Sequence, residues 1–154
     1  MLSSTVEYAL SAVVHLASRQ PTPCTTKDIA SATGIPKDYL VKVIQSLNRQ
    51  GIVITQRGIG GGVTLAKPAG QLTVLEVVNA IEPLRRYSAC PAKFQESGGL
   101  CSLHRHLDQA LAMLESNFHN TTIAKLIALP EDAKAFCLFP HTAIVPTSVG
   151  NPVE

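Results

Sequence analysis

Residues 25–67 of the chain read TTKDIASATGIPKDYLVKVIQSLNRQGIVITQRGIGGGVTLAK, and this stretch decides the fold. It contains two helical patterns joined by a glycine-containing turn. Thr25 or Thr26 is a typical N-cap for the first helix, and Gly34 is a typical left-handed residue to end it. Pro36 suits the first turn of the second helix, where a missing N–H costs no helical hydrogen bond. The sequence therefore predicts a short helix, a tight turn and a second helix.

That second helix is expected over residues 37–50, with Gly51 ending it. Its inner face is apolar at helical spacing, through Leu40, Val43, Ile44 and Leu47. Two short β-branched runs, IVIT and VTLAK, then flank the turn QRGIGGG, which predicts an antiparallel hairpin. An amphipathic helix is expected before this stretch, over residues 3–19. This order of elements is that of a winged helix-turn-helix, a class that binds DNA.

The rest of the chain predicts an appended helical region, so the expected fold class is mainly α with a small β-hairpin. Thr73 is a candidate cap for a fourth helix, and a long helix with Leu107, Leu111 and Leu114 on one stripe follows an irregular segment. We expect a DNA-binding domain over residues 1–82, a sensor loop over 83–102, a dimerisation region over 103–129 and a flexible tail over 130–154. The dimerisation region comprises a long helix over 103–119 and a short one over 122–129.

Composition is consistent with a folded, cytoplasmic DNA-binding protein. The 154 residues are 45% hydrophobic and 16% charged, which excludes disordered and collagen-like classes. No apolar run approaches the roughly 20 residues of a membrane helix, and the N-terminus lacks the basic start of a signal peptide. In residues 1–70, seven Lys and Arg outnumber three acidic residues, a net charge of +4. Such a basic half favours a nucleic-acid partner.

The polar residues on the outer face of the 37–50 helix are the candidates for contact with double-stranded DNA. They are Lys37, Asp38, Tyr39, Lys42, Gln45 and Arg49. Lys and Gln can bond base edges or phosphates, and Tyr can bond phosphate. Arg57 is expected at the hairpin tip beside several glycines, where an arginine can enter a minor groove. Each residue taken alone could equally be part of a solvated surface.

Cys90, Cys101 and His104 form the spacing C-x10-C-x2-H. Cys101 and His104 are three residues apart at the start of the long helix, so they can share one face. Thiolates suit iron–sulfur clusters, and a histidine ligand raises the potential of a two-iron cluster. The residues alone leave open a metal site or two unliganded thiols. Cys24 and Cys137 are expected to be ordinary cysteines.

The segment GIPKDYLVKVIQSLNRQGIVITQRGIGGGVTLAKPAGQLTVLEVVNAIE, residues 34–82, resembles the Rrf-type winged-helix regulators, the family of IscR and NsrR. The resemblance covers about residues 1–129 and is most specific in the wing. It implies a homodimer, a palindromic operator and a long dimerisation helix. It also implies that Asp38, Val41 and Lys42 lie where the cluster-assembly regulator reads bases, with Arg57 as its minor-groove arginine. An apolar Val41 in place of a polar reader implies a different operator.

The resemblance further implies a [2Fe–2S] cluster. Cys90 matches the first of three family cysteines, Cys101 the third, and His104 a family histidine ligand; the middle cysteine is absent. Glu7 stands where the nitric-oxide-sensing repressor has an acidic ligand that reaches over from the partner subunit. The expected cluster is thus held by Cys90, Cys101 and two of His104, the partner's Glu7 and another residue. His15 lies two turns beyond Glu7 and is expected to be structural.

The sequence is compatible with two other functions. The first keeps DNA binding but replaces the cluster by a thiol switch between Cys90 and Cys101, or by a small-molecule site. The second is an enzyme with Cys101 as nucleophile and His104 as base. The sequence offers no oxyanion site or phosphate loop for such an enzyme, because GIGGG precedes a strand rather than a helix. We therefore expect a regulator and not an enzyme.

Overall fold

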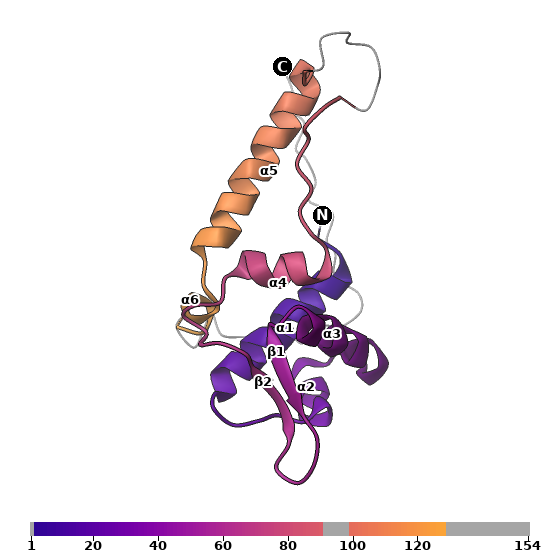
Figure 1. Ribbon diagram of the computed structural model, residues 1–154, viewed down its shortest axis with the longest axis vertical. Helices are drawn as coiled ribbons and strands as arrows, with labels where there is room; N and C mark the ends of the chain where they lie inside the picture. The colour runs from indigo at the N-terminus through magenta and orange to yellow at the C-terminus, as the bar shows by residue number, and fades with distance from the viewer. Residues whose placement is uncertain (1, 91–98, 129–154) are drawn as a thin grey trace, which may run out of the picture.

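The predicted winged helix-turn-helix is present in the computed structural model of the protein, which describes residues 2–90 and 99–128 (Figure 1). Three helices precede the hairpin: α1 (Ser4–Arg19), α2 (Thr26–Thr33) and α3 (Lys37–Arg49). Strands β1 (Val53–Gln56) and β2 (Gly62–Leu65) form the wing. Helices α4 (Val74–Ile81), α5 (Ser102–Asn120) and α6 (Ile123–Ile127) follow. The predicted fold class, mainly α with one small hairpin, is confirmed.

Helix boundaries follow the capping signals in the sequence. Thr25, rather than Thr26, caps α2 in a reciprocal capping box: its hydroxyl accepts from the Asp28 N–H, and the Asp28 carboxylate accepts from the Thr25 N–H. Gly34 ends α2 with a left-handed φ of 71°, which favours glycine. Thr73 and Glu76 form a second capping box at α4. The capping box and Gly34 thus set the two ends of α2, and Gly34 begins the turn that leads to α3.

The wing is anchored to the domain along its inner strand. β1 and β2 pair antiparallel, with Val53 opposite Leu65 and Gln56 opposite Gly62. On the other side of β2, Cys24 exchanges backbone hydrogen bonds of 3.0 and 2.8 Å with Val63. A Cβ on Gly62 would lie only 2.8 Å from the Cys24 carbonyl oxygen, so the close approach requires glycine. The segment before α2 therefore holds the base of the wing.

Helix α1 lies at the centre of the core and packs against α2, α3, α4 and α6. Its fully buried side chains are all aliphatic, as expected from a sequence without Trp. Leu40, Val43, Ile44 and Leu47 of α3 are buried, as the spacing predicts. Burial of these side chains is the main stabilising contribution to the domain. It also turns the polar face of α3 outward.

Helix α6 returns to this core although it follows α5 in the chain. Ile123 is fully buried, and its N–H donates to the Leu72 carbonyl at 2.8 Å. The Val74 N–H donates in turn to the Thr121 carbonyl at 2.9 Å. These hydrogen bonds join the start of α4 to the start of α6. The C-terminal end of α5 is therefore attached, through α6, to the winged helix.

Helix α5 projects away from the core, and its N-terminal end lies farthest from the wing (Figure 1). None of its residues is buried, and Leu103, Leu107, Met113 and Leu114 are exposed apolar side chains. An extended segment, residues 82–90, runs back along α5 toward that end (Figure 1). In the described part of the chain, no helix is both long and apolar enough to cross a membrane.

Most predicted boundaries agree with the observed ones to within two residues. The predicted helices over 3–19, 37–50 and 103–119 correspond to α1, α3 and α5. The last helix is observed only to Ile127, with Ala128 as its C-cap. Residue 129, the last of its predicted range, and the tail expected over residues 130–154 lie outside the described residues.

Candidate functional site

The outer face of α3 and the wing tip carry all seven residues that the sequence predicts to contact DNA. Lys37, Asp38, Tyr39, Lys42, Gln45, Arg49 and Arg57 are all exposed. The six that belong to α3 lie opposite the face of this helix that packs into the core. Val41 is also on this exposed surface, at 37% exposure. The structure therefore leaves all seven side chains open to solvent.

The cations of this surface are available for phosphate. Among the described residues, the salt bridges are Lys67 with Glu76 and Arg86 with Asp108 and Glu115, so none uses a cation of α3 or the wing. The Lys42 Nζ lies 5.9 Å from the Tyr39 ring centroid, and this cation–π contact holds the ammonium against the ring. Tyr39 itself contacts the Tyr8 ring of α1 at a centroid distance of 6.4 Å. The base of this surface is therefore braced by α1.

The wing tip combines Arg57 with a backbone that only glycine adopts easily. Gly58 and Gly60 have φ values of 105° and 79°, in the region that L side chains rarely occupy. Ile59 between them is fully exposed. The tip is thus a narrow, exposed loop with one cationic side chain, a shape that fits a groove of duplex DNA.

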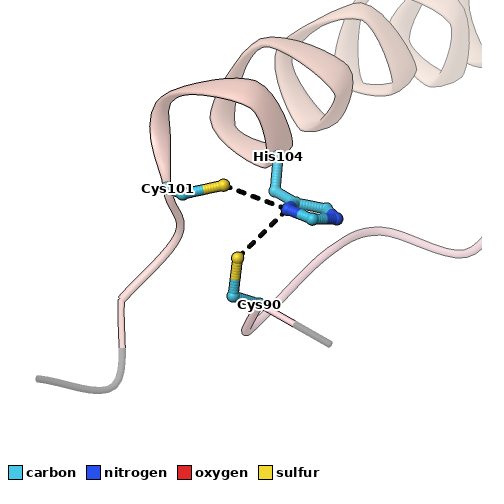
Figure 2. Close-up of side chains that lie close together, drawn as sticks. All are labelled: Cys90, Cys101 and His104. Atoms are coloured by element: carbon cyan, nitrogen blue, oxygen red, sulfur yellow. Dashed lines mark hydrogen bonds between the residues drawn. The ribbon is translucent and has the colours of Figure 1, made fainter. Parts of the chain in front are cut away.

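Cys90, Cys101 and His104 converge at the far end of α5 (Figure 2). Cys101 is the N-cap of α5, His104 follows one turn later, and Cys90 ends the extended segment. The Sγ atoms of Cys90 and Cys101 lie 3.0 and 3.1 Å from the same ring nitrogen, Nδ1 of His104. The sequence predicts all three residues as candidate ligands, and the structure brings their donor atoms together in one chain.

The local environment of Cys101 favours a thiolate. Hydrogen bonds from the His104 backbone N–H and its ring, together with the Cys90 thiol, lower the pKa of Cys101 to about 6. Cys101 also occupies the N-cap position of α5, where the helix dipole favours negative charge. By contrast, burial raises the pKa of Cys24, whose thiol lies in the core. Of these two thiols, Cys101 is the one poised as a metal ligand or nucleophile.

The donor set fits a thiophilic metal. One ring nitrogen carries either one proton or one lone pair, so hydrogen bonding satisfies only one of the two sulfurs well, whereas a metal ion binds all three donors. Sulfur and nitrogen ligands of one tetrahedral ion lie about 3.5 Å apart, so each thiol need move only about half an ångström to accommodate a metal. Cys90, Cys101 and His104 therefore offer three donors that converge on one point. They leave at least one ligand to come from elsewhere.

Glu7 is exposed in the first turn of α1 and is not part of this group within one chain. The sequence-based expectation concerns the partner's Glu7, so its ligand role stays a prediction. His15 is half-buried in α1, and burial, with Arg19 nearby, lowers its pKa, as suits a structural histidine. Cys137 lies outside the described residues.

An ion-pair cluster beside the thiols was not predicted from the sequence. Arg86 of the extended segment binds Asp108 of α5 with two hydrogen bonds of 2.6 Å and Glu115 with one of 3.0 Å. The Tyr87 N–H donates to the same Asp108 at 2.9 Å, and the Tyr87 ring meets the His104 ring edge-on at 5.1 Å. The sequence does show Arg85 and Arg86 side by side and two acids, Asp108 and Glu115, at helical spacing in α5. This pattern does not reveal which arginine binds which acid.

Comparison with known proteins identifies relatives over nearly the whole described chain. The Rrf2 family, described as "Iron-dependent Transcriptional regulator", matches residues 2–129. A candidate HTH-type transcriptional regulator of Aquifex aeolicus (strain VF5) is 30% identical over 135 residues, which cover 85% of this chain and 94% of that protein.

Solved structures share the fold. IscR of T. potens aligns with a TM-score of 0.72 and 21% identity, over 87% of this chain and 90% of its own. CymR, the global cysteine regulator of B. subtilis, aligns with a TM-score of 0.69 and 22% identity, over 82% of this chain and 95% of its own. From the family match and the Aquifex relative, this chain belongs to the Rrf2 family of DNA-binding transcriptional regulators.

Proposed function

We propose that the protein is a homodimeric transcription regulator, most simply a repressor, whose operator binding is controlled by a [2Fe–2S] cluster. The observation that carries the proposal is the meeting of two sulfurs and one imidazole nitrogen at the end of α5. The family description, an iron-dependent regulator, supports the choice of iron. Operator binding is assigned to α3 and the wing, and sensing to the Cys90–Cys101–His104 group.

A homodimer supplies what one chain lacks. The exposed apolar side chains of α5 would be covered by the α5 of a second copy, and the partner's Glu7 would complete the cluster ligands. Two α3 helices related by a two-fold axis would read a palindromic operator. A change at the metal site would alter the position of α5 and hence the separation of the two α3 helices.

For the DNA surface, Arg57→Ala is expected to weaken binding about tenfold or more, because it removes a minor-groove contact. Lys42→Ala is expected to reduce the slope of log affinity against log salt concentration by about one, because it removes one contact to a DNA phosphate. Fluorescence anisotropy measures both on a duplex of about 30 base pairs, selected from a random library by the wild-type protein. Arg85→Ala, an exposed arginine outside this surface, serves as the control. Unchanged affinity of Arg57→Ala at every salt concentration would contradict the assignment.

For the metal centre, anaerobic reconstitution is expected to give a brown protein with about two iron and two sulfide ions per cluster. Cys90→Ser and Cys101→Ser are expected to lose this iron, while Cys24→Ser keeps it because Cys24 lies in the core. Iron and sulfide analysis with a visible absorption spectrum measures the outcome. A colourless wild-type protein without iron after reconstitution sinks the cluster proposal.

The second candidate function is a thiol switch at the same place. Its support is that the Cys90 and Cys101 sulfurs lie within 4.8 Å of each other, so a small movement would allow a disulfide. A structural relative at 20% identity is an oxidised form of CymR from Staphylococcus aureus. A small-molecule site in the same region is the remaining variant of this alternative.

Both functions require a reactive Cys101, which gives a test by pH. In the metal-free protein, the rate of Cys101 alkylation by iodoacetamide is expected to rise with pH to a plateau with a midpoint near its pKa of about 6, since the thiolate is the nucleophile. Cys24 is expected to react slowly throughout, because it is buried and its pKa is raised. Mass spectrometry of the modified peptides gives both rates. A Cys101 midpoint above 8.5, the ordinary cysteine value, would contradict the environment described for it.

A further inference from the structure

The extended segment between α4 and Cys90 has few attachments to the rest of the protein. Leu84 is half-buried, and its N–H donates to the Asn79 side chain at 3.0 Å. Between Leu84 and Cys90, the attachments in the described chain are those of Arg86 and Tyr87 to α5. The position of Cys90 is therefore set by what Arg86 and Tyr87 bind.

The register of these contacts places Cys90 beside Cys101 and His104. Asp108 lies four residues after His104, so both are on one face of α5, and Cys101 is one turn before His104. The segment runs antiparallel to α5, with Arg86 at Asp108 and Cys90 at His104. The seven helical residues from 108 back to 101 span about 10 Å, and the four residues from Arg86 to Cys90 can reach at most about 13 Å when fully extended. With Arg86 fixed at Asp108, Cys90 is therefore within reach of both His104 and Cys101.

The geometry of the pair is suited to fixing a position. A guanidinium that binds a carboxylate through two nitrogens is held in one orientation, unlike a point-charge contact. Asp108 is only 17% exposed, although Arg86 is 40% exposed. The hydrogen bonds from Arg86 and the Tyr87 N–H lower the pKa of Asp108, so the carboxylate is charged at neutral pH. Exposed pairs contribute little to global stability, but this one acts on a segment with few other contacts.

We propose that Arg86, through Asp108 and Glu115, is the positioning residue that holds Cys90 against Cys101 and His104. This deepens the proposed function, because it assigns the assembly of the sensor site to an ion-pair cluster outside its ligands. It stands on the geometry of the thiols and holds whether they bind metal or form a disulfide.

The test measures how close the two thiols are, without metal. In metal-free full-length protein, oxidised glutathione takes two electrons from Cys90 and Cys101, giving one protein disulfide and two reduced glutathione molecules. The equilibrium gives the effective concentration of the two thiols, quantified from the disulfide-linked tryptic peptides that Lys93 separates. Arg86→Gln is expected to lower it about fivefold, the scale of a well-formed exposed ion pair. Arg85→Gln, the adjacent exposed arginine, is expected to leave it unchanged.

A double-mutant cycle separates this role from a general loss of structure. Asp108→Asn is expected to lower the effective concentration in the same direction as Arg86→Gln, and the double variant by less than the sum of the two, because both single variants break the Arg86–Asp108 contact. Cobalt(II) affinity, followed through thiolate charge-transfer absorbance, is expected to fall in the same variants. Equal effective concentrations in wild type and Arg86→Gln, or additive effects in the cycle, would overturn the inference. If wild type binds no metal but Arg86→Gln lowers the effective concentration, the cluster proposal fails and this inference stands.

Discussion

Packing of α2, α3, α4 and α6 around the aliphatic faces of α1 is the interaction on which the rest of the structure depends. It buries one side of α3 and leaves the other side exposed. It also fixes α4 and α6, from which the extended segment and α5 emerge. Both functional surfaces therefore take their positions from one apolar core, although neither contributes its functional side chains to that core.

The wing and the N-terminal end of α5 lie at opposite ends of the molecule (Figure 1), and the thiol site is at that end of α5. A structural change at the thiol site can alter the DNA-binding surface only through elements that contact both. Helix α5 is such an element, because its first turn carries two donors and its C-terminal end connects to α6, which packs on α1. The Arg86 cluster ties the extended segment to the middle of α5. A change in the metal site would thus act on α5 and on the extended segment, residues 82–90, together.

The fold and the DNA-facing residues were predictable because local signals specify them. Caps, the left-handed Gly34 and the apolar spacing of α3 identify the helices and their inward faces without long-range information. All three residues of the thiol site were named from the sequence: helical spacing pairs Cys101 with His104, whereas Cys90, eleven residues earlier, was tied to them by the family resemblance. The pairing of Cys24 with the wing, the return of α6 to α1 and the Arg86 cluster were missed. Each joins residues far apart in sequence, and no local pattern encodes such contacts.

The central claim is that the state of the thiol site controls DNA binding at the opposite end of the protein. The most direct measurement is the affinity of one protein preparation for one duplex, before and after its metal is loaded, at constant salt. The account predicts a difference of about tenfold or more in wild type, within the usual range of allosteric coupling, and a single affinity in Cys101→Ser. Equal affinities of the loaded and metal-free wild-type protein would contradict it.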